Sequence, residues 1–426
     1  MDRILYDTIR NMNDKCKARF CMPAHAGVGT SDSIYASAKF DWTEVPELDN
    51  LLHCENTIAF CEEAIAQSMG YASALMLTQG STCGMHIAVC VCKDKGKTLV
   101  AVGGMHKSFF SACRLYGAQV VRVDSPSELD KLDTSMQIGG VFITSPDYFG
   151  NCQDLKSVRK FADKWCAYLV VDEAHASHFA YSKLLPDNAN AYADISLMSM
   201  HKTLPVYGGG AIVCLKDKST RIDCERYRAM IHSTSPNYLV MASMDYANSY
   251  MSENGEKDYA KVKERIEEFS QVLKVGEVVK NDDFSRLVIK IDGKDAYLAL
   301  LELAKRGVYV EMAQDDLLVC IVTPFNCDLL PILAKELNNI QFNALGEEEK
   351  AQRIARTVDA NMQGKIEYVD IEDCAGRISA EDVGVYPPGI PAVLKGEIID
   401  EGVAEYLKKY RNRLFGLASG RIGVIK

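Results

Sequence analysis

The chain has 426 residues, of which 48% are hydrophobic and 25% are charged, and its formal net charge is −10. This composition is ordinary for a globular protein and excludes a mainly disordered or collagen-like chain, while the length favours two domains. The negative charge argues against a nucleic-acid partner, and the absence of any run near roughly 18 apolar residues argues against a membrane span.

The first 250 residues predict an arm followed by an α/β domain. Residues 1–50 lack clear hydrophobic periodicity and are expected to form a short helix and an irregular arm. The expected strands are 74–78, 98–102, 119–123, 141–144, 168–171, 195–198 and 211–215. Helical patterns follow these runs from Ser81, from His106, and over 127–132 and 155–165. Apolar strands that alternate with helices indicate βαβ units and a mainly parallel sheet covered on both faces, which forms a large domain over residues 51–250.

The pattern changes after a charged helix expected over 257–273. The elements expected beyond it are a strand at 287–291, a helix at 296–306, strands at 308–310 and 317–322, and a helix at 329–337. This βαββα order predicts a smaller C-terminal α+β domain over residues 251–426, with a boundary near residue 250.

The 15 cysteines do not form a metal-binding or disulfide pattern. No pair has the C-x-x-C spacing of a zinc site, and the nearest pair is Cys90 and Cys92. The segment from Met1 to Phe20 is polar and lacks the apolar core of a secretory signal. We therefore expect reduced thiols that pack as small hydrophobic side chains in a cytoplasmic protein, and no metal site.

Ligands of an open parallel sheet gather outside the carboxyl ends of its strands, so polar residues just after strands are the candidate site. The first such segment is Gly80–Thr82, which opens a helix. Free N–H groups, the positive end of the helix dipole and the hydroxyls of Ser81 and Thr82 would suit a phosphate. Taken alone, the segment is more typical of a helix N-cap.

Three further segments also follow strands. Asp172 ends an apolar strand and is either a helix cap or the counter-ion of a cationic group such as a protonated pyridine nitrogen. Lys202, within Ser199–Thr203, is either a loop lysine or, if partly buried, an amine with a lowered pKa that can form a Schiff base. His106 is either a polar helix start or an imidazole that stacks on an aromatic ring. Together the four segments predict a phosphate site, an acid, a stacking ring and an amine at one edge of the sheet.

The segment Asp172–His175 also spells the DEAH box of a nucleic-acid helicase. Such an ATPase needs a P-loop after a strand. The nearest candidate, Gly96–Thr98, precedes a strand and has Val91 where the first glycine of the motif is required. The helicase interpretation is therefore rejected.

Several motifs give the chain a family resemblance. They are Pro23–Gly27, Asp41–Glu44, Gly80–Thr82, His106–Ser108, Asp172–His175, Ser199–Pro205, Gly376–Ile378 and Tyr386–Pro391. With these motifs the chain resembles the ornithine/lysine/arginine decarboxylases, which are fold-type-I enzymes that depend on pyridoxal 5′-phosphate (PLP). The most specific motifs are His-Lys-Thr-Leu-Pro, which contains Lys202, and Tyr-Pro-Pro-Gly-Ile-Pro. The resemblance extends from about residue 23 to at least residue 397 and implies an aspartate aminotransferase-like fold.

The resemblance also implies roles for individual residues. Lys202 would bind PLP covalently, and Asp172 would pair with the pyridine nitrogen. His106 would stack on one face of the ring and Ala174 would lie against the other. The cofactor phosphate would be held by Ser81, Thr82, Ser199 and His201. His175 would lie near the ring hydroxyl or the substrate carboxylate.

At the level of the whole protein, the resemblance implies decarboxylation of lysine, arginine or ornithine to the corresponding amine and carbon dioxide, with polyamine synthesis as its context. It also implies at least a homodimer with shared sites, and no nucleic-acid or membrane partner. The segments Pro23–Thr30 and Tyr386–Pro391 would line the entrance. No residue is predicted for the side-chain cation of the substrate.

The chain departs from the family pattern in two places. No N-terminal wing domain is expected, so the chain is expected to resemble the shorter, biosynthetic-type branch. The sequence Val206–Gly210 stands where a Thr-Gln pair is expected after Pro205, and this glycine loop (Gly208–Gly210) leaves substrate identity and the dimer contact open.

Two other functions stay open at this point. An aminotransferase or side-chain lyase would keep the cofactor, and an aminotransferase would clamp the substrate carboxylate with an arginine, for which Arg377 and Arg421 are candidates by position. A PLP-binding protein without turnover is the second alternative.

Overall fold

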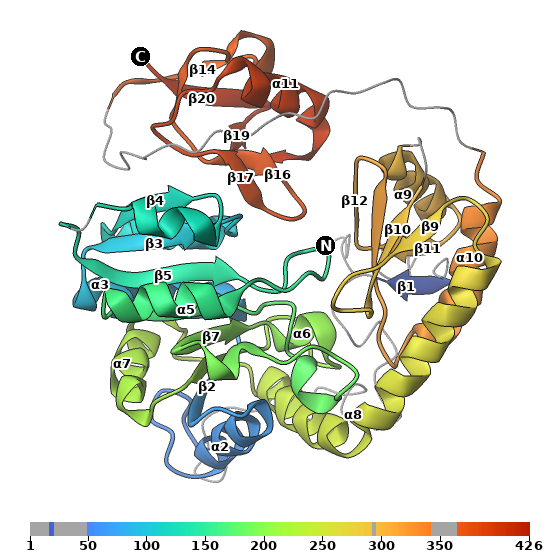
Figure 1. Ribbon diagram of the computed structural model, residues 1–426, viewed down its shortest axis with the longest axis horizontal. Coiled ribbons are helices and arrows are strands. Elements are labelled where there is room, and N and C mark those ends of the chain that lie inside the picture. The colour runs from blue at the N-terminus through green and yellow to red at the C-terminus, as the bar shows by residue number, and fades with distance from the viewer. Residues whose placement is uncertain (1–16, 21–48, 134, 292–294, 342–363) are drawn as a thin grey trace, which may run out of the picture.

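The computed structural model describes residues 17–20, 49–133, 135–291, 295–341 and 364–426 (Figure 1). Across its seven-stranded sheet the strands are β2 (Ser73–Leu77), β8 (Ala211–Leu215), β7 (Ile195–Met198), β6 (Tyr168–Asp172), β5 (Ile138–Thr144), β3 (Thr98–Val102) and β4 (Gln119–Val123). Neighbouring strands are parallel except that β8 runs antiparallel to both β2 and β7. The predicted α/β fold with a mainly parallel sheet is thus confirmed.

Helices cover both faces of this sheet. They are α2 (Thr57–Met69), α3 (Gly80–Lys95), α4 (Lys107–Tyr116), α5 (Leu155–Lys164) and α7 (Arg221–Ile231), with the short α6 (Met200–Thr203) and 3-10 turns at Pro126–Lys131, Phe179–Tyr181, Ala189–Ala191 and Lys218–Thr220. On one face Phe142 packs with Phe109 of α4, and on the other Val141 packs with Phe161 of α5. Because successive residues of a strand point to opposite faces, strands covered on both sides are apolar throughout.

A second, antiparallel sheet follows in the chain. Its strands in order are β12 (Met312–Gln314), β13 (Leu317–Ile321), β10 (Arg286–Lys290) and β9 (Glu277–Val279). The helices α9 (Ala296–Lys305) and α10 (Leu330–Asn338) accompany it, with a 3-10 turn at Cys327–Leu329, and β1 (Ala18–Phe20) pairs in parallel with β11 (Val308–Val310).

The helix α8 (Tyr238–Val272) connects the two sheets and is much longer than the predicted helix over 257–273. Figure 1 shows it running diagonally from the large sheet to the second sheet. Its first half has one face buried through residues such as Met244 and Ala247, and only a narrow polar stripe that includes Asp245 and Ser249 is exposed. Gly255 lets it approach the large domain, since a Cβ there would lie 2.5 Å from the carbonyl oxygen of Tyr181. The boundary expected near residue 250 falls inside this helix.

The last part of the chain forms a small antiparallel domain with its own core. Its elements are β14 (Ile366–Val369), β15 (Ile378–Ser379), β16 (Val383–Val385), β17 (Ile390–Val393), α11 (Glu401–Lys409), β18 (Leu414–Phe415), β19 (Leu417–Ala418) and β20 (Arg421–Ile425), with 3-10 turns at Ile371–Asp373 and Arg411–Arg413. Ion pairs of Arg114 with Asp382 and of Arg122 with Glu397 tie it to the large domain. Its β16–β17 hairpin points toward the centre of the molecule (Figure 1).

Within the described residues, no helix combines the length and the apolar character needed to cross a bilayer. The same residues contain no group of three or more His, Cys, Asp or Glu side chains placed to hold a metal ion.

Candidate active site

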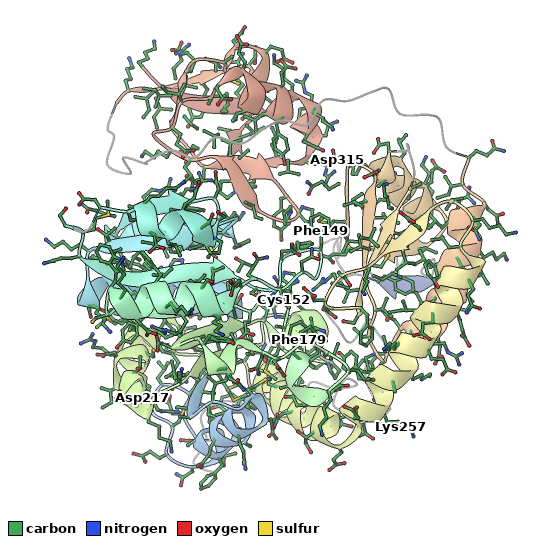
Figure 2. All side chains as sticks on the ribbon, in the orientation of Figure 1. Phe149, Cys152, Phe179, Asp217, Lys257 and Asp315 are labelled. Atoms are coloured by element: carbon green, nitrogen blue, oxygen red, sulfur yellow. The ribbon has the colours of Figure 1, made fainter. Side chains whose placement is uncertain are left out.

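The predicted site residues meet in a cavity of about 1000 Å³ at the carboxyl edge of the large sheet. Its lining includes every residue that the resemblance assigns to the cofactor or the substrate carboxylate, namely Ser81, Thr82, His106, Asp172, Ala174, His175, Ser199, His201 and Lys202. They converge because parallel strands end at the same edge, and each of these segments follows such a strand. Phe149, which also lines the cavity, lies at the centre of the molecule between the two sheets (Figure 2).

One end of the cavity is suited to an anion. The helix α3 begins there, and Ser81 and Thr82 of its first turn line the cavity, where the leading N–H groups of a helix have no partner within it. Ser199 donates a hydrogen bond from Oγ to Oγ of Ser81 at 2.7 Å. Nδ1 of His201 lies 2.9 Å from the carbonyl oxygen of Gly210, which can only accept, so Nδ1 carries the proton.

The glycine loop Gly208–Gly210 lies directly beside this end. The N–H of Gly80 donates to the carbonyl oxygen of Gly209 at 2.7 Å. Gly209 has φ 95°, and a Cβ there would come within 2.7 Å of the Thr78 carbonyl oxygen. Only glycine satisfies both conditions, so the departure from the family pattern is a tight turn against the start of α3.

An acid and an amine occupy the middle of the cavity. Asp172, the last residue of β6, is buried, and its Oδ1 accepts a hydrogen bond from the N–H of Ala174 at 3.1 Å. Burial raises the pKa of Asp172, and the charge of Lys202 opposes this rise. Loss of solvent lowers the pKa of Lys202, and the charge of Asp172 opposes that fall. Both groups are thereby shifted toward their neutral forms.

His175 links this pair to the second sheet. Its Nε2 lies 3.3 Å from Nζ of Lys202, and its Nδ1 lies 2.6 Å from Nη2 of Arg286 on β10. The ring of Tyr148 meets the imidazole edge-on at 4.8 Å between centroids. Tyr148 in turn donates from its hydroxyl to Oε1 of Glu311. Burial holds the pKa of His175 well below its usual value, and the charges of Lys202 and Arg286 add to this effect.

His106 is fixed by its own helix and by the C-terminal domain. Its Nδ1 accepts the N–H of Ser108 at 3.2 Å and so caps α4. Loss of solvent, reinforced by the charge of Lys202, lowers the pKa of His106 to about 4, so the ring is neutral at physiological pH. At the tip of the β16–β17 hairpin, Gly389 has φ 81°, and a Cβ there would lie 3.0 Å from Nε2 of His106. The N–H of Lys107 also donates to the Gly389 carbonyl at 2.9 Å.

Some residues of the site were not predicted. Tyr148 could have been found, because it follows β5 at the same edge of the sheet as the other candidates. Arg286 and Glu311 come from the second sheet and carry no local signal that would mark them.

Other predictions have different outcomes. Arg377 and Arg421, the candidate carboxylate clamps, pair instead with Glu367 at 3.1 Å and with Asp370 at 3.0 Å, and neither lines the cavity. The entrance residues Tyr386, Pro387, Pro388 and Ile390 do line it. The segments Pro23–Thr30 and Asp41–Glu44 lie outside the described residues.

Comparisons with known proteins point the same way as the geometry. The model of the Orn/Lys/Arg decarboxylase major domain matches residues 126–290, and that of the C-terminal domain of the same family matches residues 335–416. The protein YaaO of Bacillus subtilis, described as uncharacterized, is 29% identical over 87% of this chain and 85% of its own. An arginine decarboxylase of Halalkalibacterium halodurans is 25% identical over 92% of this chain and 90% of its own. The crystal structure of the Francisella novicida lysine decarboxylase LdcF shares the fold, with a TM-score of 0.73 at 15% identity over 89% of this chain and 73% of that one.

Proposed function

The chain belongs to the Orn/Lys/Arg decarboxylase family, and we propose that it decarboxylates a basic L-amino acid with PLP bound at Lys202. The observation that carries the proposal is the amine of Lys202, placed between the buried acid Asp172 and the imidazole of His175 in a cavity that opens at a helix N-terminus. This combination of groups suits a cofactor that has an aldehyde, a basic ring nitrogen and a phosphate.

The residues present fit PLP at each of its functional groups. The start of α3, the hydroxyls of Ser81, Thr82 and Ser199, and the imidazole of His201 are the groups to hold its phosphate. Asp172 has one oxygen that accepts the Ala174 N–H and a buried position that requires a cationic partner. His106 and Ala174 line the cavity as the candidates to contact the two ring faces.

When bound, PLP supplies an electron sink for the carbon that loses carbon dioxide. Asp172 would hold a proton at the ring nitrogen, since a buried carboxylate is stabilised only by a charged or hydrogen-bonded partner. His106 stays neutral and so contributes a flat surface without an added positive charge. The Nζ of Lys202, 3.3 Å from Nε2 of His175, is placed to hold and return the proton that the product needs at its α-carbon.

Glu311 is the group that we propose for the side-chain cation of the substrate. It lines the cavity from its position between β11 and β12 and accepts a hydrogen bond from Tyr148. Replacing Glu311 with glutamine is expected to raise the KM for the preferred amino acid roughly ten- to hundredfold, the value of one charge-assisted hydrogen bond. Steady-state kinetics measure this effect.

A matched variant sharpens this prediction. Tyr148→Phe removes the hydroxyl that holds Glu311 but keeps the carboxylate, so the KM should rise only a few-fold. If Glu311→Gln leaves the KM unchanged while Asp147→Asn raises it, the cation is bound by Asp147, which also lines the cavity.

The lining of the cavity favours decarboxylation over transamination. Among the described residues that line it there is no arginine to clamp the substrate carboxylate. Arg286 stands behind His175 and is 2% exposed. A reaction that expels the carboxylate has no use for a strong clamp on it.

The test of the function is a visible absorption spectrum of the PLP-loaded protein, recorded with lysine, arginine and ornithine in separate cuvettes while carbon dioxide is measured. We expect a band that shifts with one amino acid together with gas release. A shift without gas, with keto acid and pyridoxamine phosphate formed, would identify an aminotransferase. A protein that binds PLP but responds to none of the three would be a binding protein without this activity.

The proposal includes a homodimer in the cytoplasm, as the family resemblance implies. Light scattering of the purified protein measures its mass, and the mass of a single chain at assay concentration would contradict the dimer.

A further inference from the structure

A row of three side chains leads from the second sheet to the amine of Lys202. Arg286 does not line the cavity, and its Nη2 lies 2.6 Å from Nδ1 of His175. On the opposite side of the imidazole, Nε2 lies 3.3 Å from Nζ of Lys202. Arg286 and His175 are both buried, so neither contact is exchanged easily for water.

The hydrogen-bonding capacity of these groups fixes where the protons are. A guanidinium is always charged and can only donate, so Nδ1 of His175 must be the acceptor. A neutral imidazole then carries its one proton on Nε2, which points this donor at Lys202. An ammonium group also has only donors, so two cations cannot both donate to one neutral imidazole. The contact at 3.3 Å therefore requires Lys202 to be an unprotonated amine.

The surroundings of His175 prevent the alternative in which the ring is charged. The titratable groups that act on it are Lys202 from α6, Arg286 from β10, His106 before α4 and His178 from its own loop, and each of them disfavours an imidazolium whenever it carries a charge. Tyr148 presents a ring edge and shares its hydroxyl with Glu311. The acids Asp172 and Glu311 act on Lys202 and favour its ammonium form, whereas the charge of Arg286 disfavours that form directly.

We infer that Arg286 is a positioning residue that, by donating to Nδ1 of His175, sets the tautomer of this ring and keeps the Lys202 amine unprotonated and ready to react. The inference rests on the proposed role of Lys202 in binding PLP. It gives a use to an arginine that does not line the cavity and therefore meets neither substrate nor cofactor directly.

The test measures the reactivity of Lys202 in the PLP-free protein as a function of pH. Cyanate, a small amine-specific reagent, is applied over a pH series, and carbamylation of the peptide containing Lys202 is followed by mass spectrometry. Arg286→Met should move the midpoint of this profile up by at least one pH unit, which is about a tenfold slower reaction below the midpoint, with the same rate at high pH. Arg159→Met, which removes another arginine with limited exposure that pairs with Asp194, should leave the profile unchanged.

A double-mutant cycle separates action through His175 from the charge of Arg286 acting through space. In the His175→Asn background, Arg286→Met should cause no further shift, because the ring that transmits its effect is gone. A shift that persists in that background would overturn the inference, as would an unchanged profile in the single variant. If circular dichroism shows that Arg286→Met is not folded, Arg286→Gln is used instead. Its shift must likewise vanish in the His175→Asn background.

The same variants distinguish failure of the inference from failure of the proposed function. PLP is added to each PLP-free protein, reduced with borohydride and located by mass spectrometry. If the original protein attaches no PLP at Lys202, the proposed function is wrong, and the cyanate profile still decides the role of Arg286. If PLP attaches at Lys202 with the same pH dependence with and without Arg286, only the inference is wrong.

Discussion

Replacing Lys202 with alanine is expected to abolish carbon dioxide release and covalent attachment of PLP while leaving the protein folded. Lys202 is the only lysine among the described residues that line the cavity, so no neighbour there can replace its amine. Removal of a covalent catalyst of this kind lowers turnover by on the order of 10⁴- to 10⁶-fold. Gas release with saturating PLP and amino acid measures the loss, and borohydride reduction with mass spectrometry measures the attachment.

The stability of this variant should change little. Lys202 is a buried amine whose contact is to His175, so its removal loses one hydrogen bond but also relieves the cost of burying a polar group. We expect a change within about 1 kcal/mol, measured by urea unfolding. Lys216→Ala, which removes an exposed lysine that donates to the carbonyl oxygen of Ala191, is the control and should keep full turnover. Turnover of Lys202→Ala at more than a few percent would contradict the assignment.

The rule that ligands gather at the carboxyl ends of parallel strands located the middle of the site, because local sequence determines where each strand ends. Asp172 is the last residue of β6 and Ser199 directly follows β7, and parallel pairing of these apolar strands brings their ends together. The same rule applied to β5 would have reached Tyr148. Sequence patterns alone are therefore enough to find most of the site residues that the large domain contributes.

The contributions of other parts of the chain have no such local signal. Arg286 is the first residue of a buried strand, and in the sequence it is simply a charged residue at the end of that strand. In the structure, however, it contacts His175 from another sheet. Likewise, the motif of residues 386–391 marks the hairpin as special, but its closeness to His106 depends on how the C-terminal domain is placed. Such contacts join residues far apart in the chain, and periodicity carries no information about them.

The largest effect on stability is expected from Glu62→Ala. Glu62 on α2 is fully buried, and its carboxylate accepts from Nη1 of Arg228 at 2.6 Å and from Nη2 of Arg221 at 2.5 Å. It also accepts the N–H of Met76 in β2 at 2.9 Å. Without it, Arg228, which is 1% exposed, becomes a buried cation without this counter-charge. Removal of one partner of a buried ion pair costs about 3–5 kcal/mol, and the free energy of unfolding in urea should fall by that amount.

Two further variants identify the cause of that loss. Glu225→Ala removes the more exposed partner of Arg221 on α7, at 2.6 Å, and should cost less than about 1 kcal/mol because solvent screens that pair. Replacing Glu62 and Arg228 together with methionine removes both charges and should recover much of the stability lost in Glu62→Ala, since a buried pair can be exchanged for apolar side chains of similar volume. If the double variant is no more stable than Glu62→Ala, the loss comes from the N–H of Met76 and from packing rather than from the uncompensated guanidinium. If Glu62→Ala costs no more than Glu225→Ala, the buried carboxylate does not stabilise the junction of α2, α7 and β2.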